Sequence, residues 1–221
     1  NLVNNSIIAQ YRDRSLKYLH PSSVKRRLAV ISHLFSIARK EWGFKIENPV
    51  LDISKPKLPE PRDRRFTKLE LNNLIYGNKT SSKLKSIIQI ALETGMRQGE
   101  ILRIKRENIN DKSLFIPVAK TKPRKIPLTT KAIEILNNVV LPFELSGMAV
   151  SKQFNKLCKF YNIKDARFHD LRRQALTNFM KDKKLTVAET MYISGHSDPR
   201  MLLGVYNNLK CEDISDKING N

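Results

Sequence analysis

Apolar side chains recur every three or four positions through most of the chain, and this spacing is typical of helices packed on one face. The clearest early example runs from Val24 to Trp42, is preceded by two serines that can cap it, and is followed by Gly43 as a stop. A shorter helix is expected around residues 7–19. The N-terminal part of the chain is therefore predicted to be helical.

Further helices are predicted after residue 66. Thr67 and Glu70 have the spacing of a capping box at a helix start, and the apolar pattern of residues 84–94 stops at Gly95. The same periodicity predicts helices at about 130–141, 150–162, 169–182, 186–194, 198–209 and 212–218.

Two short segments have the character of strands. Residues 113–119 and 125–128 flank a basic tip, which predicts a hairpin. The fold class expected from these elements is mainly α with a small antiparallel β-sheet.

A proline-rich segment divides the chain. Pro56, Pro59 and Pro61 stand too close together for a helix and favour an extended spacer. We therefore predict a helical domain at 1–58, a linker at 59–66 and a second domain at 67–221.

Composition narrows the function classes. Forty-one Lys and Arg against 21 Asp and Glu give a net charge of +20, which favours a nucleic acid as partner. No apolar run reaches the ~18–20 residues of a membrane span, so no membrane contact is expected. Two cysteines are too few for a disulfide framework or a zinc finger, and a reducing, cytoplasmic setting without a bound metal is expected. The chain begins without Met, and we expect it to be a piece of a longer protein.

Several residues could act together on a phosphodiester, a reaction that needs cations, a nucleophile and an acid. Arg97 follows a helix stop, and His169 and Arg172 are three residues apart, on one helix face. His196 follows a glycine, and Tyr206 ends an amphipathic stretch. Taken singly, each has an ordinary alternative: a cap arginine, a capping histidine or a core tyrosine.

Together these residues resemble the tyrosine recombinase (phage integrase) family. The matching segments are Thr94-Gly-Met-Arg-Gln-Gly-Glu100, the hairpin at 119–128, His169-Asp-Leu-Arg172, Gly195-His196 and Tyr206, in the family's order. The proline-rich linker is similar to the junction between that family's core-binding and catalytic domains. The resemblance implies a tyrosine-recombinase catalytic fold preceded by part of a helical core-binding domain.

The resemblance also implies roles for the matching residues. Arg97 and Arg172 would clamp the scissile phosphate, with Glu100 supporting the first of them. His169 would act as a base or donor for the tyrosine's proton, and His196 would donate to a phosphate oxygen.

Tyr206 would be the nucleophile that forms a 3′-phosphotyrosyl intermediate. It stands ten residues after His196, one more than the commonest family spacing, so the loop at 197–198 would have to absorb a rotation of about 100°. Lys120 is the first candidate for the general acid and Lys122 the second. The other basic residues expected to contact DNA are Lys122, Arg124, Lys125, Arg173, Arg62, Arg64, Arg65, Lys25 and Arg26.

The function implied is that of a site-specific recombinase or integrase of a bacterial phage or mobile element. It would act as a tetramer on double-stranded DNA without a cofactor, with DNA-bending or directionality proteins as further partners. Two alternatives stay open: a non-catalytic DNA-binding accessory protein of the same fold, and a DNA-relaxing enzyme of the type IB topoisomerase kind.

Overall fold

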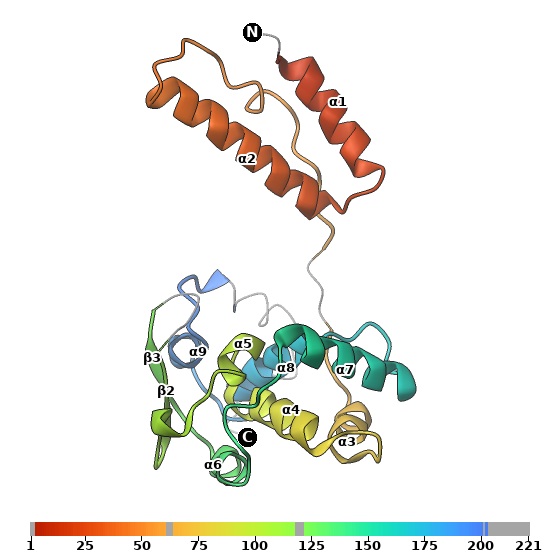
Figure 1. The fold of residues 1–221 in the computed structure, drawn as a ribbon, viewed down its shortest axis with the longest axis vertical. Coiled ribbons are helices and arrows are strands. Elements are labelled where there is room, and N and C mark those ends of the chain that lie inside the picture. The colour runs from red at the N-terminus through yellow and green to blue at the C-terminus, as the bar shows by residue number, and fades with distance from the viewer. Residues whose placement is uncertain (1–2, 61–63, 118–121, 201, 203–221) are drawn as a thin grey trace, which may run out of the picture. The chain divides into compact units, whose positions relative to one another are not determined.

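The structure is a computed structural model that describes residues 3–60, 64–117, 122–200 and 202 of the 221. It divides into two compact units, Asn1–Asp63 and Arg64–Asn221, and the division falls inside the predicted linker (Figure 1). Within the described ranges, no helix combines the length and the apolar character that a bilayer span requires.

The first unit contains α1 (Asn5–Leu16) and α2 (Pro21–Lys40). The prediction that two serines cap the second helix is wrong. His20 is the N-cap, and its side chain accepts from the backbone N–H of Ser22. Proline follows directly, where its missing N–H costs nothing. A small core of Ile8, Val24, Leu28 and Val50 joins the two helices to the segment after them.

The second unit is mainly helical and contains one small sheet. Its elements are α3 (Lys68–Tyr76), α4 (Ser82–Thr94), α5 (Gln98–Ile101), the 3-10 turn η1 (Arg106–Asn108), β1 (Ile109–Asn110), β2 (Ser113–Ile116), β3 (Arg124–Pro127), α6 (Thr130–Asn137), α7 (Gly147–Phe160), α8 (Phe168–Lys181) and α9 (Val187–Ser194). The predicted fold class, mainly α with a small antiparallel sheet, is confirmed.

Helix α4 is central to this unit and packs against α3, α6, α7 and α8 (Figure 1). Ile87, Ile88 and Ile90 are fully buried, so the helix is covered on several sides. Its end was predicted correctly, because Gly95 adopts a left-handed conformation with φ +62° and closes the helix. The capping box of Thr67 and Glu70 is also present.

The sheet is antiparallel in the order β1-β2-β3, and its first strand was not predicted. Leu114 pairs with Ile126 and Ile116 pairs with Arg124. Because side chains alternate along a strand, Arg124 lies on the same, inward face as the buried Ile126, while Lys125 is exposed. The strand predicted at 113–119 ends at Ile116. Because Arg124 points inward, its guanidinium reaches the carboxylate of Glu100 in the site.

Most of the two final predicted helices, 198–209 and 212–218, lies outside the described residues. At the start of the first, the Asp198 carboxylate accepts from the N–H of Arg200, and Leu202 donates to the carbonyl of Pro199. These bonds are those of a helix N-terminus.

Candidate active site

The turn after α4 fixes the direction of Arg97. The Thr94 hydroxyl donates to the carbonyl of Ile90 at 2.6 Å and accepts from the N–H of Met96 at 3.3 Å. A Cβ on Gly95 would come within 3.0 Å of Leu176, so a side chain here would meet α8 as well as backbone strain. The turn therefore places Arg97 directly before α5, as its N-cap.

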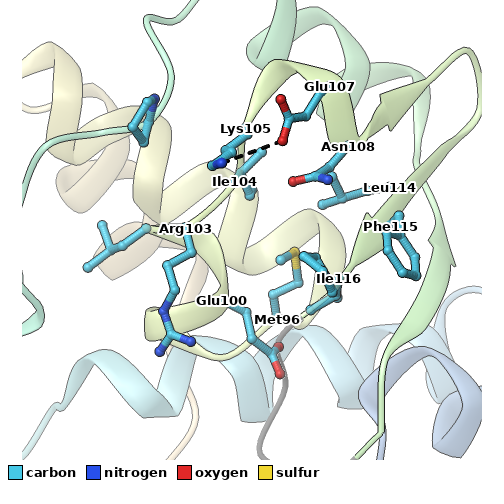
Figure 2. Close-up of a pocket in the computed structure, with 13 residues that line it drawn as sticks. Met96, Glu100, Arg103, Ile104, Lys105, Glu107, Asn108, Leu114, Phe115 and Ile116 are labelled. Atoms are coloured by element: carbon cyan, nitrogen blue, oxygen red, sulfur yellow. Dashed lines mark hydrogen bonds and ion pairs between the residues drawn. The ribbon is translucent and has the colours of Figure 1, made fainter.

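A cavity of about 460 Å³ lies beside this turn (Figure 2). Met96, Ile104, Leu114 and Phe115 give it an apolar lining, and Glu100 lies at one side. Neither Arg97 nor Arg172 lines the cavity. The cationic cluster formed by Arg97, Arg124 and Arg172 therefore lies outside this cavity.

Glu100 holds Arg97 in two ways. Its Oε2 accepts from the backbone N–H of Arg97 at 3.0 Å, and its Oε1 accepts from Nη1 of the same residue at 3.1 Å. The contact expected between these two residues is therefore present.

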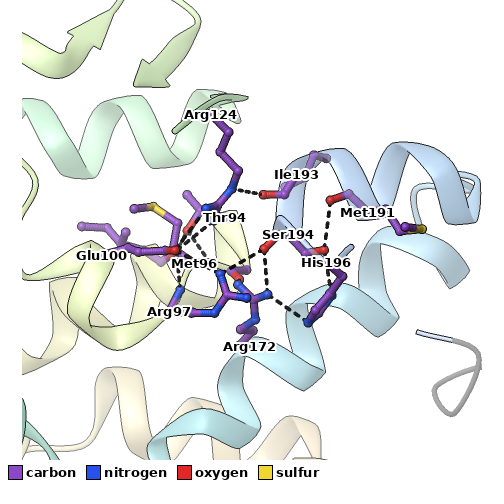
Figure 3. A network of polar contacts seen from close by, with 12 residues as sticks. Thr94, Met96, Arg97, Glu100, Arg124, Arg172, Met191, Ile193, Ser194 and His196 are labelled. Carbon is purple, nitrogen blue, oxygen red and sulfur yellow. Dashed lines mark hydrogen bonds and ion pairs between the residues drawn. The ribbon is translucent and has the colours of Figure 1, made fainter. Parts of the chain in front are cut away.

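Arg124 is a second partner of the same carboxylate. Its Nη1 lies 3.0 Å from Oε1 of Glu100 and its Nη2 lies 2.8 Å from Oε2, while its Nε donates to the carbonyl of Ile193 at 3.0 Å (Figure 3). Its side chain is only 8% exposed. The expectation that Arg124 contacts DNA disagrees with this geometry, because its guanidinium is occupied inside the protein.

Two opposing effects set the pKa of Glu100. Burial raises it, but the hydrogen bonds from Arg124 and from the backbone of Arg97 outweigh burial and hold the pKa below its usual value. The carboxylate is thus ionised at neutral pH. It neutralises part of the positive charge of the two arginines.

Arg172, on α8, is almost fully buried. Its Nη1 donates to the carbonyl of Gly95 at 2.7 Å, and its Nη2 donates to the carbonyl of Ser194 at 2.8 Å and lies 3.2 Å from Nε2 of His196. Burial, reinforced by the charge of Arg97, lowers its pKa to about 9, so the guanidinium stays charged at pH 7. Among the described residues, no carboxylate contacts it directly.

The end of α9 supplies the remaining groups. Gly195 closes the helix with φ +68°, and a Cβ there would lie 3.1 Å from the guanidinium of Arg124. Glycine is therefore favoured by the left-handed backbone, and a side chain here would also crowd the guanidinium of Arg124. His196 follows at once and is partly buried.

Two guanidiniums converge on one carbonyl oxygen. Nη1 of Arg97 lies 3.5 Å from the oxygen of Ser194, and Nη2 of Arg172 lies 2.8 Å from it (Figure 3). The structure thus brings Arg97, Arg172 and His196 together from three separate segments of the chain.

Both histidines lie in a positive field. Burial first, and then the charges of Arg172 and Arg97, lower the pKa of His196 to about 4. His169 is exposed on the first turn of α8, one turn before Arg172. Partial desolvation and the charges of Arg172 and Arg173 lower its pKa too. Both rings are therefore neutral at pH 7.

Three of the predicted site residues, Arg62, Lys120 and Tyr206, lie outside the described residues. Lys122, the second candidate for the general acid, is exposed. The roles proposed for these residues stay predictions.

Arg64 and Arg65 have partners inside the protein. Arg64 pairs with Glu70 at 2.5 Å and lies over the ring of Phe66, and Arg65 donates to the carbonyl of Arg173 at 3.2 Å. Both arginines therefore help to hold the start of α3 in place. Their expected contact with DNA, like that of Arg173, stays a prediction.

The other basic residues expected to contact DNA are exposed: Lys125 on β3, and Lys25 and Arg26 on α2. They leave their charge in solvent, as a phosphate contact requires.

Sequence reasoning missed two features of the site. It did not predict that Arg124 points inward, and it did not single out the side chain of Ser194. The position of Arg124 could have been found, because it stands two residues before an apolar strand residue and so shares its face. For Ser194 the sequence held no comparable sign.

Comparison with known proteins supports this assembly of motifs. Residues 64–141 match the phage integrase family. The chain is 34% identical over 228 residues to a shufflon-specific DNA recombinase of Escherichia coli, a match that covers 96% of this chain and 59% of that protein. It is 33% identical over 221 residues to a protein of Haemophilus influenzae assigned as an integrase/recombinase, covering 92% of this chain and 72% of that protein.

Solved structures share the fold. A lambda integrase dimer bound to a COC′ core site superposes with a TM-score of 0.78 at 21% identity, covering 91% of this chain and 81% of that chain. The Tn1549 transposon integrase in complex with a circular intermediate DNA gives a TM-score of 0.81 at 16% identity, covering 99% and 85%. The order of the motifs, the fold and the relatives agree: the chain belongs to the phage integrase family of tyrosine recombinases.

Proposed function

We propose that this chain cleaves and rejoins DNA strands in site-specific recombination through a 3′-phosphotyrosyl intermediate. The observation that carries the proposal is the convergence of Arg97 and Arg172 on the carbonyl oxygen of Ser194, with His196 beside them. Two guanidiniums at one point, one of them without a carboxylate partner among the described residues, form a site for an anion.

The free donors of Arg97 fit a phosphate. Its Nη1 is used by Glu100 and Ser194, whereas no acceptor within the described part of the chain contacts its Nε or Nη2. Nε and Nη2 form one edge of the guanidinium, and this edge can donate to two oxygens of one phosphate. The side chain of Arg97 is 23% exposed, so part of it is open to solvent.

In the proposed reaction, the Tyr206 oxygen bonds to phosphorus as the bond from phosphorus to the 5′ oxygen breaks. The phenol proton leaves to His169, and the 5′ oxygen takes a proton from Lys120 or Lys122. The two arginines neutralise the charge that builds on the non-bridging oxygens. One phosphoester replaces another, so rejoining needs no ATP.

We further propose that the protein works as a tetramer on two DNA duplexes. A lambda integrase tetramer bound to a Holliday junction shares this fold with a TM-score of 0.79, although this chain covers only 64% of that chain. The charge of +20 is suited to holding several phosphate backbones.

A nicked duplex library of randomised sequence tests the chemistry. Once cleavage releases the short strand beyond the nick, the covalent intermediate cannot reverse and accumulates. We expect adducts that survive SDS with the native protein and none with Tyr206→Phe. Adducts with both proteins would place the nucleophile elsewhere, and tight binding without adducts would favour a non-catalytic accessory protein.

Replacing the 5′ bridging oxygen of the DNA by sulfur shows which of Lys120 and Lys122 is the general acid. A 5′-bridging phosphorothioate has a leaving group that needs no proton, so losing the general acid no longer slows its cleavage. The general acid is the lysine whose alanine variant, Lys120→Ala or Lys122→Ala, cleaves the oxygen substrate slowly and the sulfur substrate at the normal rate.

Relaxation of a supercoiled plasmid without strand exchange would instead favour the topoisomerase-like activity.

A further inference from the structure

The side chain of Ser194 is fully buried in the cationic cluster, yet the proposed reaction gives it no task. Its Oγ lies 2.9 Å from Nδ1 of His196 and 3.4 Å from the carbonyl oxygen of Met191 (Figure 3). The other ring nitrogen of His196 lies 3.2 Å from Nη2 of Arg172. Both nitrogens of this imidazole are therefore engaged.

The chemistry of the partners fixes the direction of each bond. A guanidinium has only donors, so Nε2 of His196 must accept from Arg172 and carries no proton. The proton of the neutral ring is then on Nδ1, which donates to the Ser194 hydroxyl. The hydroxyl in turn donates to the carbonyl of Met191. The result is one chain of donors from Arg172 through His196 and Ser194 to the backbone of α9.

We propose that the Ser194 hydroxyl is a positioning group for His196, which holds the proton on Nδ1 and keeps Nε2 directed at the arginine pair. The opposite tautomer would place an N–H of the ring against an N–H of Arg172. Without an acceptor at Nδ1, only that repulsion would distinguish the two tautomers.

The same bond serves the ring when DNA is bound. A phosphate oxygen at the arginine pair competes with Nε2 for the N–H groups of Arg172. When Nε2 takes a proton from solvent, it can donate to that oxygen, while the bond from Nδ1 to Ser194 is unchanged. Because the hydroxyl accepts in both states, the ring can change charge without turning.

Removing the hydroxyl leaves the rest of the cluster in place. In Ser194→Ala the backbone carbonyl that accepts from Arg97 and Arg172 is retained, and only the Oγ is lost. Ser194→Cys keeps a side chain of similar size but offers a weaker acceptor. Ser86→Ala is the matched control, since within the described part of the chain that hydroxyl bonds only to the carbonyl of Ser82 in its own helix.

The first readout is the tautomer, measured by ¹⁵N NMR of histidine-labelled protein without DNA. The chain has four histidines, and His196→Gln identifies the signals of interest. We expect a protonated Nδ1 in the native protein and in Ser86→Ala, a mixture of tautomers in Ser194→Ala and an intermediate state in Ser194→Cys. An unchanged His196 spectrum in both Ser194 variants overturns the proposal.

The second readout is single-turnover cleavage of the nicked duplex, and it rests on the proposed function. We expect Ser194→Ala to cleave about tenfold to a hundredfold more slowly, because the ring is misplaced by a fraction of its width, with DNA affinity within about twofold. A mixed tautomer with an unchanged cleavage rate overturns the positioning role. If the native protein forms no adduct while the tautomer still depends on Ser194, the proposed function fails and the positioning of His196 stands.

Discussion

Glu100 and Arg124 form a bidentate ion pair, with nitrogen–oxygen distances of 3.0 and 2.8 Å, and both side chains are under 10% exposed. The same carboxylate binds the backbone N–H and Nη1 of Arg97. A single buried acid therefore ties strand β3 to the turn that presents the first arginine. This contact sets the position of strand β3 relative to the proposed phosphate site.

Arg124→Ala is expected to destabilise the second unit. Removing one partner of a buried pair leaves the other charge poorly compensated, which costs on the order of 3 kcal/mol in the free energy of unfolding. Urea unfolding followed by circular dichroism measures this change. Lys125→Ala is the control on the same strand, because Lys125 is exposed and its loss should cost under about 0.5 kcal/mol. Equal losses from both variants would contradict the buried pair.

The pH dependence of stability should report His196. Its pKa falls from 6.5 to about 4 on folding, so between these values the unfolded state binds more protons and stability rises with pH. The contribution is fully present above pH 6.5 and is lost as the pH falls toward 4. One pKa unit corresponds to ~1.4 kcal/mol, so the loss from a fall between 6.5 and about 4 amounts to at most about 4 kcal/mol.

Urea midpoints from pH 4.5 to 7.5 measure this slope. His196→Gln should flatten it, and His169→Gln should flatten it as well, because the pKa of His169 is lowered too. The pKa of Glu100 is also lowered, and its contribution is lost only below about pH 4.5. The histidine window can therefore be read separately. A slope that His196→Gln leaves unchanged would contradict the neutral, buried ring.

Gly195→Ala is expected to act partly through Arg124. The left-handed backbone alone costs an alanine about 1–2 kcal/mol, and the new Cβ would also come within 3.1 Å of the guanidinium. In the Arg124→Ala background that second cost disappears. A double-mutant cycle measured by urea unfolding should therefore give a coupling of at least about 0.5 kcal/mol. Additive costs would mean that the glycine is needed for its backbone conformation alone.

Local sequence rules predicted much of the fold. The stop at Gly95 and the capping box of Thr67 and Glu70 each depend on neighbouring residues, and both are present. The short strand β1 and the cap at His20 were missed, because two residues give no periodicity and histidine is an unusual cap. Short elements of this kind are decided by tertiary contacts.

The sequence predicted which residues belong to the candidate site better than it predicted the contacts between them. Order and spacing indicated Arg97, Arg172 and His196, and the structure brings them together. That Arg124 faces inward depends on strand register, and that Ser194 meets His196 depends on the turn at Gly195. Contacts between distant segments follow from packing, which spacing alone does not encode.

Arg172→Lys tests whether the geometry of the guanidinium, beyond its charge, is required. Three of the five N–H groups of Arg172 serve Gly95, Ser194 and His196. A lysine ammonium is a single point of charge and cannot span these acceptors and a phosphate together. We therefore expect single-turnover cleavage to fall by about 10²–10³-fold, the cost of losing one preorganised donor to the developing charge.

Because the charge is kept, the salt dependence of DNA binding should be nearly unchanged in Arg172→Lys. Arg103→Lys is the control for the exchange itself, since Arg103 is exposed and lies outside the cluster. Cleavage by Arg172→Lys within about tenfold of the native rate would mean that any cation suffices at this position. An equal loss in Arg103→Lys would mean that the effect is not specific to Arg172. A loss of cleavage in Arg172→Lys alone, at constant DNA affinity, would show that the reaction needs the guanidinium of Arg172, which joins α8 to the turn after α4 and to the turn before His196.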